Sequence, residues 1–147
     1  MILSQTSIYA LKAVMHLAEG GPGVPRRVDD IAAELGVPRN YLSKILHGLV
    51  RSGVLHSTRG PGGGFTLALD PTGLALAQVI QPFDDIAHGS SCLLGRERCS
   101  DDTPCAAHAG WRAVSASVVA YLNDTTIRDM THSGASLNGD RTTGPNP

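Results

Sequence analysis

Glycine and proline fill five of the six positions from 59 to 64, in the run Arg-Gly-Pro-Gly-Gly-Gly. A helix or a strand does not continue through such a run, because glycine loses the most backbone entropy on ordering and proline fixes one backbone angle. The flanking segments 54–58 and 65–69 are rich in apolar and β-branched side chains and read as short strands. The run therefore predicts the tip of a β-hairpin that carries almost no side-chain bulk.

The segments before the hairpin predict three helices. Residues 4–19 repeat apolar side chains at spacings of three and four, which is the pattern of a helix with one buried face. A second, short helix is predicted over 28–35, with Gly36 as its C-cap. The third helix starts at Pro38, where the missing N–H of proline costs nothing, and closes at Gly53.

The order of these elements predicts the fold class. Two short amphipathic helices joined by a tight turn form a helix-turn-helix, and a following β-hairpin makes it a winged helix. We expect a mainly α protein with a small β-hairpin wing, a short helix over 74–80 and a long dimerisation helix near the C-terminus. The expected units are a winged helix-turn-helix domain (1–82), a cysteine-bearing loop (83–105), a dimerisation helix with a C-terminal turn (106–132) and a disordered tail (133–147).

The long helix, predicted over 106–122, carries a stripe of small residues on one face. The stripe consists of Ala109, Ala113, Ala116 and Ala120. Small side chains let two helix backbones approach each other closely, so we interpret this helix as the contact of a homodimer. The alternative is ordinary packing within one chain.

The formal net charge of −1 hides an uneven distribution. Residues 1–60 hold seven Lys or Arg against four Asp or Glu, and the stretch from Pro38 to Gly60 holds no acid at all. On a helix-turn-helix, such a basic stretch favours double-stranded DNA as the partner. A solvated face without a partner is the plainer interpretation of a charge run taken alone.

A recognition helix presents its first turn to base edges in the major groove, while a wing contacts phosphates. The predicted DNA-contacting residues are Arg39, Asn40, Tyr41, Ser43, Lys44, Arg59, Gly60, Gly62 and Gly63. The glycine run is not a nucleotide-binding loop, because no Gly-Lys-Ser/Thr follows it and no helix begins there. The alternatives are a hairpin that contacts nothing and a helix-turn-helix used only for packing.

All three cysteines fall within one window, with the spacing Cys92-x6-Cys99-x5-Cys105-x2-His108. Three thiolates and one imidazole suit an iron–sulfur cluster or zinc, so these four residues are the predicted metal ligands. The paired Cys-x2-Cys knuckles of structural zinc ribbons are missing. Zinc and free or disulfide-switching thiols stay open as alternatives, and His16 and His88 are possible substitute ligands.

Several classes of protein are disfavoured by the sequence. No run of eighteen apolar residues and no signal-peptide order is present, so we expect a cytoplasmic protein with no membrane partner. No grouping of His, Asp and Glu is typical of an acid–base active site, so we expect no enzyme. An iron–sulfur electron carrier is a remote alternative, because it has no use for a basic recognition helix and a wing.

The glycine-rich wing and the three cysteines together resemble the Rrf2 family of bacterial transcriptional regulators, over residues 1–131. The matching segments are 3–10, Ala32-x2-Leu35-Gly36-Val37, Tyr41-Leu42, Leu49, Gly53-x-Leu55, the run 59–64 and the three-cysteine loop. Within the family, Cys105-x2-His108-Ala109-x-Trp111-Arg112 and Tyr121-Leu122-Asn123 resemble the IscR-like iron–sulfur regulators.

The resemblance implies a homodimeric repressor that binds a palindromic operator and holds one [2Fe-2S] cluster per subunit through Cys92, Cys99, Cys105 and His108. A [4Fe-4S] cluster or zinc is the weaker alternative. The nitric-oxide-sensing branch takes an acidic ligand from the first helix of the partner, and Ile8 stands at that position here. The implied signals are iron–sulfur status, redox state or nitric oxide.

Overall fold

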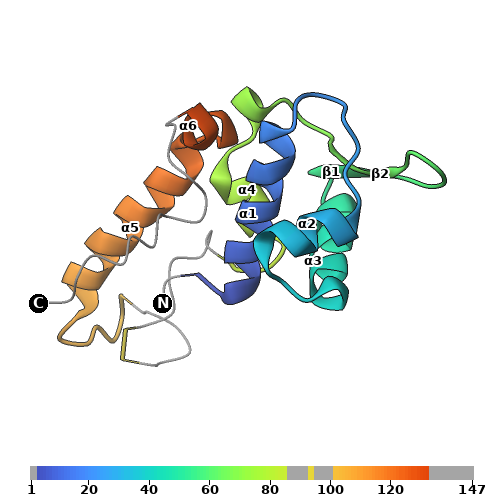
Figure 1. Ribbon diagram of the computed structural model, residues 1–147. Helices are drawn as coiled ribbons and strands as arrows, with labels where there is room; N and C mark the ends of the chain where they lie inside the picture. Colours follow the sequence, from blue (N-terminus) through green and yellow to red (C-terminus); the bar gives the residue numbers. More distant parts are fainter. Residues whose placement is uncertain (1–2, 86–92, 95–100, 133–147) are drawn as a thin grey trace, which may run out of the picture.

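The computed structural model describes residues 3–85, 93–94 and 101–132. It is mainly helical, with one two-stranded hairpin that projects on the side opposite the last long helix (Figure 1). The elements are α1 (Gln5–Glu19), α2 (Val28–Leu35), α3 (Arg39–Arg51), β1 (Leu55–Thr58), β2 (Gly64–Leu67), the 3-10 turn η1 (Pro71–Gly73), α4 (Leu76–Ile80), α5 (His108–Asp124) and α6 (Ile127–His132).

Helix α1 runs through the middle of the core. Ser4 caps its N-terminus, where the Ser4 hydroxyl accepts a hydrogen bond from the Ser7 N–H. The helix packs against α2, α3, α4 and α6, and Ala10, Ala13 and Val14 are completely buried there. The largest buried side chains around it are Ile31, Leu42, Ile45, Leu46, Leu49, Leu55, Leu74, Ile80 and Ile127.

The helix-turn-helix forms where the sequence predicts it. Gly36 ends α2 in the left-handed conformation, with φ of 64°, which a residue with a Cβ rarely adopts. Pro38 stands at the N-cap of α3, one residue before the helix itself. The helix ends at Arg51 with Ser52 as its C-cap, two residues before the predicted end at Gly53.

The wing is an antiparallel hairpin with Leu55 opposite Leu67 and Thr58 opposite Gly64. Arg26 adds a third backbone segment: its N–H donates to the Phe65 carbonyl at 3.0 Å, and the Phe65 N–H donates back at 2.8 Å. Buried Phe65 thereby fastens the hairpin to the segment that leads into α2. Sequence patterning does not show this bridge, because a single paired residue leaves no periodicity.

The predicted helix over 74–80 is shorter in the structure. Leu74 and Ala75 are extended, because this segment pairs with the backbone of residues 125–127. The Leu76 N–H donates to the Thr125 carbonyl at 3.0 Å, and the Ile127 N–H donates to the Leu74 carbonyl at 2.8 Å. This bridge ties the end of α5 and the start of α6 to the body of the protein.

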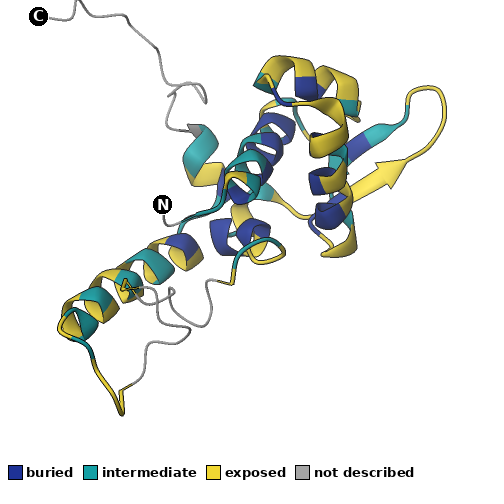
Figure 2. Ribbon diagram, turned by 90° about the horizontal axis from the view of Figure 1, so that it is seen from below, coloured by how far each residue is buried: buried dark blue, intermediate teal, exposed yellow. Residues whose placement is uncertain are grey.

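Helix α5 is covered by the rest of the chain only in part. Leu122 is its one buried residue, whereas Val114 and Tyr121 are more than half exposed. All four alanines of the small-residue stripe are exposed as well. Figure 2 shows the helix extending away from the body with exposed and half-buried residues along its length.

The predicted fold class, a mainly α winged helix with a β-hairpin wing, is confirmed. None of the helices among the described residues is both long and apolar enough to cross a membrane. The predicted tail 133–147, and Cys92, Cys99 and His88, lie outside the described residues.

Candidate DNA-binding surface and candidate metal site

The first turns of α3 carry most of the predicted DNA contacts. Arg39, Asn40 and Lys44 are exposed, and Ser43 is half-buried. They are displayed because the other face of α3 is fixed in the core by Leu42, Ile45, Leu46 and Leu49. A helix held this way on one side presents its opposite, polar side to a partner.

Arg39 is not an isolated charge. Its Nε donates to Asp29 Oδ1 at 2.5 Å, and both side chains are more than half exposed. The ion pair links α2 to the start of α3 and compensates part of the positive charge of Arg39. Lys44 has no acid on its own helix, because α3 contains none.

Tyr41 lies partly against α1 instead of pointing wholly outward. Its hydroxyl is hydrogen-bonded to Thr6 Oγ1 at 2.6 Å, and its ring meets the Tyr9 ring edge-to-face with centroids 5.8 Å apart. Tyr41 keeps 36% of its residue surface exposed, so these contacts do not bury it. Tyr41 therefore has a structural partner that its position on the recognition helix does not indicate.

The tip of the wing is formed by glycines that cannot be replaced without distortion. Gly60 and Gly62 have φ of 89° and 75°, and the Gly63 N–H donates to the Gly60 carbonyl at 2.9 Å. A Cβ on Gly63 would stand 2.4 Å from the Thr58 carbonyl oxygen, which is a severe clash. Exposed Arg59 is the one charged side chain in this run.

The candidate metal site lies at the start of α5. Half-buried Cys105 precedes the helix, and His108 is its first residue. The His108 N–H donates to the Cys105 carbonyl at 3.0 Å, so the two predicted ligands share one turn. The other two, Cys92 and Cys99, lie outside the described residues. Within the described part of the chain, no group of three or more His, Cys, Asp or Glu is placed to hold a metal ion.

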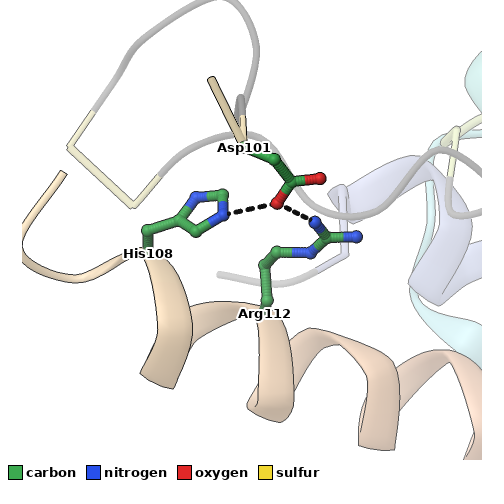
Figure 3. Close-up of polar contacts among 3 residues, drawn as sticks. All are labelled: Asp101, His108 and Arg112. Atoms are coloured by element: carbon green, nitrogen blue, oxygen red, sulfur yellow. Dashed lines mark hydrogen bonds and ion pairs between the residues drawn. The ribbon is translucent and has the colours of Figure 1, made fainter. Parts of the chain in front are cut away.

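Asp101 joins this site and was not predicted from the sequence. Its Oδ1 accepts hydrogen bonds from Arg112 Nη1 and from His108 Nε2, the latter at 2.8 Å (Figure 3). The hydrogen bond from Arg112, followed by that from His108, holds the pKa of Asp101 below its usual range. The spacing of His108 and Arg112, one helical turn apart, is the one sequence signal for this cluster.

Asp84 was also missed. Its Oδ2 accepts hydrogen bonds from the Ser4 N–H, the Ser4 hydroxyl and the Ser7 hydroxyl. Desolvation raises the pKa of Asp84, but the hydrogen bonds from Ser7 and Ser4 outweigh it and leave the pKa lowered. The partners lie about eighty positions apart in the chain, so no local pattern reveals the contact.

A family model described as "Rrf2: Iron-dependent Transcriptional regulator" matches residues 3–133. The chain belongs to the Rrf2 family. It is 36% identical over 132 residues to a candidate HTH-type transcriptional regulator of Aquifex aeolicus, which covers 88% of this chain and 91% of that protein. It is 31% identical over 130 residues to the HTH-type transcriptional regulator IscR of Vibrio atlanticus, covering 88% of this chain and 75% of that one.

A solved structure shares the fold of this Rrf2 protein. The structure of CymR, titled the global cysteine regulator of B. subtilis, matches with a TM-score of 0.75 at 23% identity, covering 89% of this chain and 96% of CymR. At that identity the likeness shows the fold. This Rrf2 protein is thus a transcriptional regulator with a winged-helix fold, and its named homologues are transcriptional regulators, not enzymes.

Proposed function

We propose that this Rrf2 protein is a homodimeric repressor that binds a palindromic DNA operator and responds to iron–sulfur status, redox state or nitric oxide through a [2Fe-2S] cluster. The observation that carries the proposal is the placement of two sites on one body. An exposed basic face on α3 and the wing supplies the DNA surface. Cys105 lies just before α5, and His108 is the first residue of that helix. The cytoplasm is the compartment that such a role requires.

In this proposal α3 enters the major groove with Asn40, Ser43 and Lys44, together with Arg39 and Tyr41. Arg59 and the backbone of Gly60, Gly62 and Gly63 contact the phosphates or the minor groove beside it. The proposal requires two copies joined along α5 to present two recognition helices to the same side of a duplex, where successive half-sites lie about 34 Å apart. The exposed alanine stripe and the exposed Val114 and Tyr121 support this contact.

The donor set fits an iron–sulfur cluster. Cys92, Cys99, Cys105 and His108 would hold it, and the close placement of Cys105 and His108 on one turn supports two of these four assignments. Bound there, the cluster supplies a redox-sensitive, labile centre whose presence reports on iron and oxidants. The chain's own part is to orient His108 through Asp101 and Arg112 and to transmit the state of the site to α5.

An anaerobic visible absorption spectrum, with iron and sulfide analysis on protein purified without added metal, tests this half of the proposal. We expect broad visible bands with about two iron and two sulfide per chain. Replacing Cys92, Cys99 and Cys105 by Ala abolishes the bands and leaves a folded protein. A triple variant that keeps its colour contradicts the ligand assignment.

A regulator that uses zinc, or the thiols alone, is the second candidate. The likeness to CymR of Staphylococcus aureus, whose structure is described as an oxidized form, favours the thiol-based candidate. Colourless protein with one equivalent of zinc, or DNA binding that responds to thiol oxidation in metal-free protein, supports this candidate and contradicts the cluster. Either result leaves the DNA-binding surface unaffected.

A further inference from the structure

Asp84 connects the segment after α4 to the first turn of α1. Its Oδ2 lies 2.9 Å from the Ser4 nitrogen, 2.9 Å from the Ser4 hydroxyl and 2.5 Å from the Ser7 hydroxyl. Ser7 is completely buried, and a buried hydroxyl without a partner is costly. The carboxylate therefore satisfies both Ser7 and the N-cap of α1, and it fixes that turn relative to the end of α4.

The same turn of α1 holds the recognition helix. Thr6, which lies between Ser4 and Ser7, is hydrogen-bonded to the Tyr41 hydroxyl at 2.6 Å, and Tyr9 one turn further packs its ring against Tyr41. Tyr41 is the third residue of α3, in the part of the helix that faces DNA. Asp84 and Tyr41 therefore both form hydrogen bonds with the first turn of α1: Asp84 with Ser4 and Ser7, and Tyr41 with Thr6.

Phe83 adds a direct contact with α3. A Cβ on buried Gly48, in the middle of α3, would stand 3.0 Å from Phe83 Cε1, so the ring lies on the glycine's open face. Residues 83 and 84 together therefore touch α3 itself and the α1 turn that positions α3. The chain leads from here, through residues outside the described part, to the predicted ligand Cys92.

We propose that Asp84 is a positioning residue for DNA binding, which fixes the first turn of α1 and through Thr6 and Tyr41 the angle of the recognition helix. The proposal rests on the DNA-binding surface proposed above. Asp84 itself makes no contact with DNA in this arrangement.

A double-mutant cycle in DNA affinity tests the proposal. The probe is a duplex selected from random-sequence DNA on the wild-type full-length protein, and the variants are Asp84→Asn, Tyr41→Phe and the double. We expect each single change to weaken binding about three- to tenfold. Tyr41→Phe keeps the ring on the proposed DNA surface and removes only the hydroxyl bound to Thr6, so it breaks the same linkage as Asp84→Asn. The double variant should therefore bind DNA no more than about twofold more weakly than the single variant with the lower affinity.

Two further readouts separate positioning from direct contact and from general loss of stability. Thr6→Val removes the hydrogen bond of Tyr41 from the α1 side and should weaken binding as much as Tyr41→Phe does. The salt dependence of binding should be unchanged in Asp84→Asn, because no phosphate contact is lost, whereas Lys44→Ala lowers it. Circular dichroism confirms folding at the assay temperature, and Ser7→Ala replaces Asp84→Asn in the cycle if the latter is unfolded.

Asp70→Asn is the matched control. Asp70 also accepts a backbone and a hydroxyl hydrogen bond, both from Thr72, but in a turn that packs on α6. Any effect of Asp70→Asn on the free energy of DNA binding should add to the effect of Tyr41→Phe. Unchanged DNA affinity in Asp84→Asn, or an additive Asp84–Tyr41 cycle, overturns the positioning role while leaving the DNA surface intact. If Lys44→Ala and Arg59→Ala both bind the duplex as tightly as the wild-type protein, the proposed DNA surface itself is wrong.

Discussion

Three aspartates among the described residues each accept more than one hydrogen bond on a single carboxylate oxygen. Asp70 caps a 3-10 turn, Asp84 caps α1 from a distance, and Asp101 binds His108 and Arg112. In each case hydrogen bonding stabilises the charged form and keeps the pKa below its usual range. These carboxylates therefore contribute stability that depends on their being ionised.

Asp84→Asn is expected to lower the free energy of unfolding by about 1–2 kcal/mol at pH 7, because it weakens three hydrogen bonds to a charged acceptor. The folded-state pKa is depressed, so the contribution is fully present above the ordinary value of 3.8 and is lost as the pH falls through the folded pKa. Urea denaturation at several pH values between 3 and 7 should show the gap between wild type and variant narrowing at the acid end.

The exposed Asp124→Asn at the end of α5 is the control for this prediction, with an expected change within about 0.5 kcal/mol at every pH. If the difference in unfolding free energy between wild type and Asp84→Asn stays constant down to pH 3, the ionised carboxylate of Asp84 is not the form that stabilises the fold.

Lys44→Ala and Arg59→Ala are each expected to weaken DNA binding and to reduce the slope of log affinity against log salt by about one, because each removes one positive charge from the proposed DNA surface. Fluorescence anisotropy at several salt concentrations measures both quantities. Arg128→Ala removes the same charge from α6, which is outside the proposed DNA surface. This variant should leave the slope of log affinity against log salt unchanged. Equal slopes for Lys44→Ala and Arg128→Ala would refute the role of Lys44.

Among the elements, the helices were predictable and the pairings between distant segments were not. The sequence predicts α3 and its buried face because apolar side chains recur at helical spacing within one short segment. These side chains are Leu42, Ile45, Leu46 and Leu49. The bridge of Arg26 to Phe65 involves single residues far apart in the chain, which leave no pattern. For the candidate site, the exposure of Lys44 followed from α3, whereas the partner of Tyr41 on α1 required the tertiary structure.

Gly63→Ala is expected to distort the wing, because its Cβ would stand 2.4 Å from the Thr58 carbonyl oxygen. We expect about a tenfold loss of DNA affinity, because in the proposed complex the backbone of the tip contacts phosphates. Circular dichroism should show that the helices of the core are retained. Gly73→Ala is the matched change, because no atom lies within 4 Å of its added Cβ. If both variants bind DNA equally well, the wing is not part of the interface.

For the whole molecule, the exposed face of α5 determines the expected assembly. Ala116→Glu places a charge on the small-residue stripe and should convert the proposed homodimer to a monomer. Analytical ultracentrifugation measures this change, and we expect weaker binding to a palindromic duplex along with it. Ala116→Ser keeps the side chain small and should leave the dimer intact. A dimer that survives Ala116→Glu would show that another surface joins the subunits.

The backbone bridge between Ala75 and Thr126 has a consequence for how the protein unfolds. Buried Leu122 and Ile127 belong to the same core as α1, although they follow all three cysteines in the chain. Melting the last two helices would open that core, so the protein is expected to show a single calorimetric transition. Proteolytic nicking between 85 and 101 would then yield two fragments that remain associated until they denature together.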